Sequence, residues 1–158
     1  MPAHFNRPFE TEIAFEVKSY DVDYVGYVHN AVYIRWLEDL RNTMLQAYYP
    51  LERFVNEGQS PILARTSIEY KRPLRLFNRF TGRVWVTQLE GVRWSVEHEL
   101  LHEGKVAATA EQSGIFLNLK THRPVAVPAE LIEKFSAFQL QTAQLQTVQL
   151  QTVQQQAI

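Results

Sequence analysis

The most constraining feature of the sequence is a run of alternating apolar and polar residues that begins after Pro61 and continues to Leu119. Such alternation is typical of strands with one buried face, because successive side chains point to opposite faces of a sheet. Turn signals at Glu90-Gly91 and Glu103-Gly104 divide the run into hairpins. The chain is therefore predicted to fold around an antiparallel sheet.

Four strands are predicted within this run, each from the residues of one face. The faces hold Ile62, Ala64, Thr66, Ile68 and Tyr70 before Pro73; Phe80, Gly82, Val84 and Val86; Trp94, Val96, His98 and Leu100; and Val106, Ala108 and Ala110. We expect the last strand to bulge near Gly114, and then to continue with Ile115, Leu117 and Leu119 on that face.

One further strand and one long helix are predicted ahead of this run. Thr11–Lys18 alternates with period two, whereas apolar residues recur at spacings of three and four between Asn30 and Tyr48. Asn30 is the expected N-cap of this helix, and Pro50 stops it. The fold class is therefore α+β, an antiparallel sheet of about five strands with one long central helix on its curved face.

The C-terminal end has a different composition from the rest. A five-residue repeat, Gln-Leu-Gln-Thr-Ala or Gln-Leu-Gln-Thr-Val, occupies residues 139–153 and fits neither the helical period nor the strand period. We expect one domain over residues 1–138, including a short helix after Pro128, and a Gln-rich low-complexity tail over 139–158 that is solvated or a frayed helix. The rival interpretation of the tail is a self-association segment.

Composition excludes several classes of function. A formal charge of −1 without a large basic or acidic block implies neither nucleic acid nor an anionic membrane as a partner. The chain has no cysteine, so disulfides, thiolate metal sites and a cysteine nucleophile are excluded. Its first residues lack the apolar region of a signal peptide, and no later run reaches the length of a membrane span. We expect a soluble, cytoplasmic protein.

The stretch from Asp21 to Tyr33 contains most of the residues that could take part in a reaction. Two carboxylates, Asp21 and Asp23, follow the first strand, and Gly26 precedes the start of the helix. The first N–H groups of a helix have no partner within it and carry partial positive charge, so they can hold a developing oxyanion. The plain interpretation of either aspartate is a turn or capping residue, and for Asp21 a solvated or turn carboxylate is the interpretation that we adopt.

Asp21-Val22-Asp23-Tyr24-Val25-Gly26-Tyr27-Val28-His29-Asn30-Ala31-Val32-Tyr33 resembles the signature of the hotdog-fold acyl-CoA thioesterases, in their 4-hydroxybenzoyl-CoA thioesterase-like branch. Ser67–Leu74 resembles the second strand of that family, and Val92–Ser95 resembles its hairpin before the fourth strand. The resemblance extends from about Phe9 to Lys134. It implies the hotdog fold, in which a β-sheet wraps around one helix.

The resemblance also implies site residues. Asp23 lies at the position of the catalytic carboxylate, Gly26 at the turn toward the helix, and Asn30 where a backbone N–H forms the oxyanion hole. The implied substrate-binding residues are Val28, His29, Tyr33, Lys71, Arg72 and Arg93, of which the basic ones would face the phosphates of CoA. Without the resemblance, Tyr33 is most simply a core or interface aromatic residue, and Lys71 and Arg72 belong to a solvated basic strand edge.

The implied reaction is hydrolysis of an acyl-CoA or acyl carrier protein thioester, with Asp23 as general base or nucleophile. It needs no cofactor and no metal, and the family leads us to expect a homodimer or homotetramer. Two alternatives remain. One is a hotdog hydratase or dehydratase, whose Asn-Pro between aspartate and histidine is absent here, and the other is a non-catalytic acyl-CoA-binding protein. The acyl group and its carrier are left open.

Overall fold

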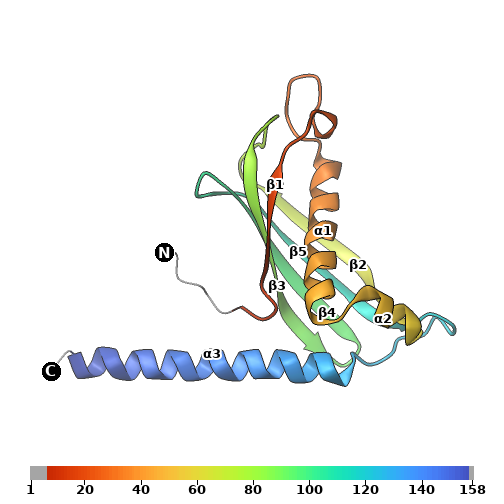
Figure 1. Cartoon of the computed structure of the whole chain (residues 1–158), viewed down its shortest axis with the longest axis vertical. Helices are drawn as coiled ribbons and strands as arrows, with labels where there is room; N and C mark the ends of the chain where they lie inside the picture. The colour runs from red at the N-terminus through yellow and green to blue at the C-terminus, as the bar shows by residue number, and fades with distance from the viewer. Residues whose placement is uncertain (1–6, 157–158) are drawn as a thin grey trace.

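The computed structural model describes residues 7–156 as one curved sheet with a long helix on its concave face (Figure 1). The elements are β1 (Thr11–Glu16), a 3-10 turn (Ser19–Asp21), α1 (Asn30–Tyr48), α2 (Leu51–Asn56), β2 (Gln59–Tyr70), β3 (Arg79–Glu90), β4 (Arg93–His102), β5 (Lys105–Asn118) and α3 (Ala129–Gln156). The strands are ordered β1-β3-β4-β5-β2, and every neighbouring pair is antiparallel. This arrangement confirms the predicted α+β hotdog fold. None of the described helices is long and apolar enough to cross a membrane.

The predicted helix is α1, with the predicted bounds. The side chains at its apolar spacing are buried against the sheet, among them Trp36, Leu37 and Leu40. The predicted cap is wrong by one residue. His29 has extended φ and ψ angles of −63° and 139° and is the N-cap, so Asn30 is the first helical residue. The first N–H of the helix proper therefore belongs to Asn30.

The two predicted hairpins are confirmed, and so is the inward face of β3 and β4. Glu103 and Gly104 both have positive φ, as a two-residue hairpin loop of type I′ requires. Phe80, Gly82, Val84, Val86, Trp94, Val96, His98 and Leu100 are all buried. At Gly82 an added Cβ would lie 2.9 Å from the Leu40 side chain, so α1 approaches the sheet closely here.

The predicted bulge in the last strand is misplaced. Buried residues alternate unbroken in β5 from Ala108 through Gly114 to Phe116, so Ile115 and Leu117 are on the opposite face to the one expected. The irregularity of β5 lies earlier, at Ala107, and near Gly114 the register instead shifts in β2, between Leu63 and Arg65. A Cβ on Gly114 would lie 1.8 Å from the carbonyl oxygen of Ile62, so β2 crosses this position at backbone contact. The predicted single face of β2 is consequently wrong, because the extra residue turns its first half over relative to Thr66, Ile68 and Tyr70.

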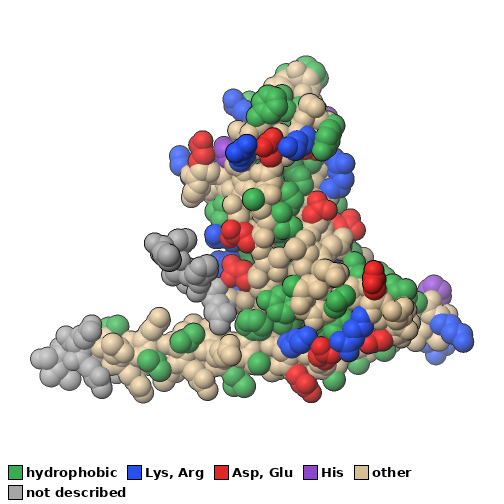
Figure 2. Space-filling model, viewed as in Figure 1, with side chains coloured by type: hydrophobic (Ala, Val, Ile, Leu, Met, Phe, Trp, Pro, Cys, Tyr) green, Lys and Arg blue, Asp and Glu red, His purple; other side chains and the backbone are tan. Residues whose placement is uncertain are grey.

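The short helix expected after Pro128 continues through the proposed boundary at residue 138 as the single helix α3. Leu131 and Phe135 are buried, whereas Leu140, Leu145 and Leu150 are more than half exposed. Successive leucines of the repeat are rotated by about 140° around the helix, so they form no single apolar stripe. Figure 2 shows this part of α3 projecting from the body without charged side chains, since Lys134 is the last charged residue.

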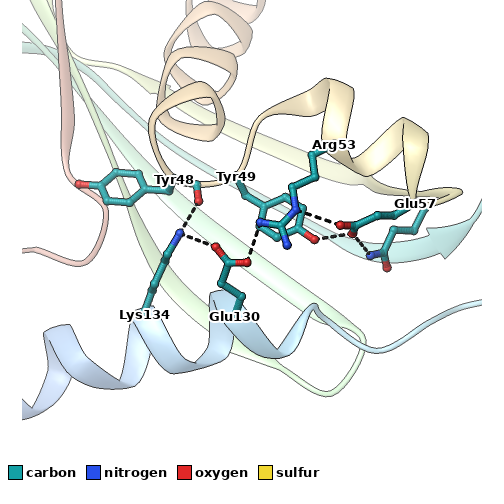
Figure 3. A network of polar contacts seen from close by, with 7 residues as sticks. Tyr48, Tyr49, Arg53, Glu57, Glu130 and Lys134 are labelled. Carbon is teal, nitrogen blue, oxygen red and sulfur yellow. Dashed lines mark hydrogen bonds and ion pairs between the residues drawn. The ribbon is translucent and has the colours of Figure 1, made fainter.

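A polar network fixes the start of α3 to α1 and α2 (Figure 3). Lys134 Nζ donates to the carbonyl oxygen of Tyr48 and to Glu130, both at 2.8 Å. Arg53 bridges Glu130 at 2.6 Å and Glu57 at 2.9 Å, and the Tyr49 hydroxyl donates to Glu57. The C-terminal end of α1 is therefore held by two neighbouring helices.

Candidate active site at the N-terminal end of α1

The loop ahead of α1 is closed by its own backbone. Val22 pairs with Val28, and the Asp23 N–H donates to the Tyr27 carbonyl oxygen at 2.8 Å. Between these ends Gly26 has a φ of +82°, a value that side-chain-bearing residues rarely adopt. Gly26 thus allows the tight reversal that brings the chain to the start of the helix.

Asp23 organises this loop. Its Oδ1 accepts the backbone N–H of Val25 at 2.9 Å and that of Tyr27 at 3.1 Å. Its Oδ2 takes part in none of the hydrogen bonds found among residues 7–156. The carboxylate is therefore held in place through one oxygen, while the other is available to a ligand or to water.

Asp21 differs from its expected character. It is a turn carboxylate, since its Oδ2 accepts the Lys18 N–H at 2.9 Å, but it is only 4% exposed and so is not solvated. Its carbonyl oxygen accepts the His29 N–H at 3.0 Å, and its Oδ1 lies 3.6 Å from Arg35 Nη2. Burial is possible because each of its polar atoms has a partner. Asp21 thereby fixes the position at which α1 begins.

The start of α1 presents unused donors. His29 makes no side-chain cap, and no hydrogen bond from the N–H of Asn30 or Ala31 is found in the described part of the chain. Groups of this kind at a helix N-terminus attract negative charge. Because both flanking side chains, His29 and Asn30, are exposed, the donors are accessible from the surface.

A pocket of about 310 Å³ adjoins these donors and brings five of the predicted site residues together. It is lined by Val28, Asn30, Tyr33, Lys71 and Arg72 with Tyr27, Tyr70, Pro73 and Leu74. Tyr33 is buried at its base, with its ring 4.9 Å from that of Tyr70, and burial raises the pKa of Tyr33. The pocket combines an aromatic floor, a basic rim and helix N–H groups.

Four predicted residues lie outside this lining. Asp23, Gly26 and His29 belong to the adjoining loop, whereas Arg93 begins β4 at the opposite end of the sheet. Register places Arg93 level with Ile62 of β2 and places Leu100 level with Tyr70, a separation of about 23 Å along the strands. Within one chain, Arg93 is therefore not part of the pocket.

Sequence reasoning missed Tyr27 and Tyr70 as pocket residues, together with the contact of Arg75 with Tyr27. Arg75 Nη2 donates to the Tyr27 hydroxyl at 3.1 Å, and its guanidinium lies 5.0 Å from the centre of that ring. Tyr27 stands inside the motif, so its position was a usable signal. The place of Arg75 depends on the pairing of Tyr27 with Arg75 across the loop, which no local pattern reveals.

A larger hollow of about 1330 Å³ lies on the other side of α1, between that helix and the β1 edge. It is wide, half of its lining residues are charged, among them Glu16, Lys18 and Glu38, and it contains none of the predicted site residues. The smaller pocket carries the open helix donors, so we place the site there. Among residues 7–156, no three His, Asp or Glu side chains gather as a metal site requires.

Comparison with known proteins is consistent with this geometry. A model of the thioesterase-like superfamily matches residues 17–135, which include the loop, α1 and β2 to β5. The long-chain acyl-CoA thioesterase FadM of Escherichia coli is 28% identical over 121 residues, or 75% of this chain and 92% of that protein. The chloroplastic acyl-acyl carrier protein thioesterase ATL3 of Arabidopsis thaliana is 24% identical over 132 residues, or 82% of this chain and 70% of that protein.

Solved structures share the fold at lower identity. DHNA-CoA thioesterase from Staphylococcus aureus superposes with a TM-score of 0.78 at 17% identity, covering 85% of this chain and 94% of that one. A second Staphylococcus aureus protein, solved in complex with CoA, gives 0.77 at 21% identity and covers 82% and 83% of the two chains. Since the matched family model spans most of the chain and contains the whole candidate site, the chain belongs to the thioesterase-like superfamily.

Proposed function

We propose that this protein hydrolyses acyl thioesters of CoA or of acyl carrier protein at the N-terminal end of α1. The observation that carries the proposal is the pair of N–H groups at Asn30 and Ala31 that bond to none of the described residues and adjoin a pocket. The loop that leads into them carries Asp23, of which one carboxylate oxygen is likewise unbonded in the described part of the chain. Membership of the thioesterase-like superfamily supports it, as do relatives named for acyl-CoA and for acyl carrier protein substrates.

The reaction follows from these groups. With the thioester carbonyl oxygen at the Asn30 N–H, a water molecule attacks the carbonyl carbon and gives its proton to Asp23. The C=O electron pair moves to oxygen, where the helix N–H stabilises the charge. Collapse of this intermediate breaks the C–S bond, and the leaving thiolate takes the proton back from Asp23. In the alternative route Asp23 attacks directly, and water then hydrolyses the resulting mixed anhydride.

The remaining pocket residues would bind rather than react. Lys71 and Arg72 are exposed at the rim, where their charges suit the phosphates of CoA or of a phosphopantetheine arm. Val28 and Tyr33 provide apolar surface for the thioester. His29 is exposed next to the donors and would contact the carrier side of the substrate. Gly26 acts through the loop geometry alone.

A second copy of the chain would complete the site. β2 is an edge strand, and its flanking side chains Ile62, Leu63 and Tyr70 are each more than a third exposed. If β2 pairs antiparallel with β2 of a second copy, the sheet of that copy continues the first sheet in the opposite orientation, so the β4 start of one copy and the β2 end of the other lie at the same end of the joined sheet. Such a pair places Arg93 of the partner subunit at the end of the joined sheet where Tyr70 of this chain lies. Arg93 would then serve the site of the other protomer, in a homodimer or in a tetramer built from it.

The test is thiol release from aryl-CoA, short-chain, medium-chain and long-chain acyl-CoA and acyl carrier protein substrates, followed with a chromogenic thiol reagent. We expect at least one substrate to be hydrolysed, and Asp23→Asn to lower kcat by about 10²- to 10⁴-fold, as expected when general-base catalysis is removed. Asp39→Asn is the matched control, since Asp39 is an exposed carboxylate further along α1.

Two results contradict the proposal. One is a folded wild type that binds these thioesters without releasing thiol from any of them. The other is an Asp23→Asn variant with the activity of the Asp39→Asn control.

A further inference from the structure

A buried polar cluster lies under the middle of α1, away from the pocket. Arg41 Nη1 donates to Gln112 Oε1 at 2.7 Å, and His98 Nε2 lies 3.1 Å from the same oxygen. Gln112 Nε2 in turn donates to Thr66 Oγ1 at 3.1 Å. His98 and Gln112 are 2% and 1% exposed, so α1, β4, β5 and β2 meet here around polar atoms in an otherwise apolar core.

The cation of this cluster has no ion-pair partner among the described residues. Arg41 is half-buried, and none of the ion pairs found among residues 7–156 includes it. The groups that contact its guanidinium are neutral: the Gln112 amide and the Trp94 ring at 5.7 Å, with His98, whose pKa burial lowers to about 4, beside them. Burial lowers the pKa of Arg41, because a desolvated cation without a paired carboxylate is costly, and the exposed Glu38 carboxylate, three residues earlier on α1, raises that pKa by less.

Two further polar atoms of the cluster are buried without a partner. Trp94 Nε1 and His98 Nδ1 make no hydrogen bond to any residue of the described range 7–156, and Trp94 is only 5% exposed. An indole N–H can only donate. With the N–H groups of Arg41 that are not bonded to Gln112, the cluster therefore has more hydrogen-bond donors than there are acceptors for them in the described part of the chain. An oxygen-bearing ligand would satisfy them.

The cluster and the pocket are linked by the same two elements, α1 and β2, and the separation between them can be measured along each. The Tyr33–Tyr70 ring contact joins α1 to β2 at the pocket, and the Arg41–Gln112–Thr66 bonds join the same two elements further along. Arg41 lies eight residues after Tyr33, or about 12 Å further along α1, and about 80° around the helix from it. Tyr70 and Thr66 are on one face of β2, about 13 Å apart. The two spans agree, so one extended ligand could touch both places.

We propose that Arg41 determines acyl specificity by binding a carboxylate at the far end of the acyl group, since Arg41 lies about 16 Å along α1 from the Asn30 N–H that would hold the thioester carbonyl. The inference rests on the proposed thioesterase function, with the acyl group running from the Asn30 donors between α1 and β2. A carboxylate accepts two parallel N–H bonds from a guanidinium and would supply the directly paired negative charge that Arg41 lacks among the described residues. A single aromatic ring held at Tyr33 would end well short of Arg41, so the matching class is a medium-chain dicarboxylic acyl thioester.

The test compares decanedioyl-CoA with decanoyl-CoA, two substrates that differ only in the terminal carboxylate. We expect wild type to prefer the dicarboxylic substrate, and Arg41→Met to lower its kcat/KM by about 10- to 100-fold, the worth of a charge-assisted hydrogen bond. Arg41→Met should leave decanoyl-CoA unchanged or improved. Arg41→Lys should keep part of the preference, and Arg123→Met, at an exposed arginine in the loop after β5, should keep all of it.

Equal wild-type activity on the two substrates would overturn the inference, and so would an equal loss on both in Arg41→Met, which would make Arg41 structural. Failure of the proposed reaction gives a different result. If no thioester is hydrolysed, calorimetry with the two non-hydrolysable thioether analogues still reports whether Arg41 selects the carboxylate. Thermal unfolding of each variant shows whether Arg41→Met still folds. If it does not, the test is Arg41→Lys, which should keep part of the preference for decanedioyl-CoA over decanoyl-CoA.

Discussion

The two ends of α1 are built differently. At the C-terminal end, the Tyr48 carbonyl accepts from Lys134, the Tyr49 N–H donates to the Leu45 carbonyl, and the Tyr49 hydroxyl donates to Glu57. At the N-terminal end, the cap residue makes no side-chain bond, and the N–H groups of Asn30 and Ala31 are unused in the described part of the chain. One end is satisfied by the protein itself, and the other is left for a ligand. Stability and chemistry should therefore respond to different substitutions of one helix.

Among changes to α1 itself, the largest effect is expected from removing a single donor at the open end. Asn30→Pro deletes one N–H at the first helical position, where proline is tolerated because that N–H has no helical partner. The preceding His29 already has the extended conformation that a residue before proline prefers. We expect kcat to fall by about 10²- to 10³-fold, as for other oxyanion donors, with little change in Tm.

Asn30→Ala is the matched control, because it removes the side chain and keeps the N–H. Its kcat should stay within a few-fold of wild type. If the proline and alanine variants lose activity equally, the side chain rather than the backbone acts at this position, and the contrast between the two ends fails.

The buried cluster under the middle of α1, through His98 of β4, should determine how far stability falls in acid. Burial lowers the pKa of His98 from 6.5 to about 4, so between these values the unfolded chain binds a proton that the folded chain does not. The free energy of unfolding should therefore fall as the pH drops from 6.5 toward 4, by up to about 3 kcal/mol from this residue. Urea denaturation at pH 7 and pH 4.5 measures the loss.

His98→Gln provides the comparison for that measurement, because glutamine can still bond to Gln112 but does not titrate. Glu16, Glu57 and Glu130, whose pKa values are lowered by their cationic or hydroxyl partners, destabilise both proteins alike in acid. The acid loss should shrink in the variant. An identical loss would mean that His98 is protonated without cost in the folded protein.

A smaller effect is expected at the satisfied end. Tyr49→Phe removes the hydrogen bond to Glu57 but keeps the ring, which lies 4.3 Å from that of Phe54. The free energy of unfolding should fall by about 1 kcal/mol, while kcat/KM stays unchanged. Tyr48→Phe is the control, since the Tyr48 hydroxyl makes no hydrogen bond found among residues 7–156. A rate effect in Tyr49→Phe would couple the two ends.

The smallest effect is expected from the far part of α3. Deleting residues 147–158 removes only exposed side chains over the described positions, so the free energy of unfolding should change by less than about 0.5 kcal/mol. Activity should be unchanged as well. The self-association interpretation of the repeat would instead be supported if the deletion lowered Tm and if Tm rose with protein concentration in the full chain but not in the truncated chain.

Local patterns were enough for most of the fold. The spacing of Trp36, Leu37 and Leu40 places α1, and alternation gives the buried faces of β3 and β4, because both patterns arise within single elements. The bulge in β2 escaped prediction because its cause is the close approach of the Ile62 carbonyl to Gly114, a contact between distant segments. The continuation of α3 escaped because its repeat has no amphipathic period.

The candidate site was partly accessible for the same reason. Val28, Asn30 and Tyr33 are neighbours in the sequence, and the motif that contains them also marks the pocket. The cluster of Arg41, His98 and Gln112 is assembled from α1, β4 and β5, so each of its members looks unremarkable in its own segment. Arg93 was assigned from resemblance, and its position at the other end of the sheet keeps it out of the pocket of its own chain.

The projecting helix also determines how the molecule moves. Beyond Gln146, which still lines a surface hollow with Arg7 and Trp85, α3 continues for about 15 Å as a rod that projects from the body, and its described side chains from Thr147 to Val153 are exposed (Figure 1). A rod on a compact body adds friction out of proportion to its mass, so this chain of 18.4 kDa should diffuse and sediment more slowly than a sphere of equal mass. Its rotation should be anisotropic, with the slow axes perpendicular to α3.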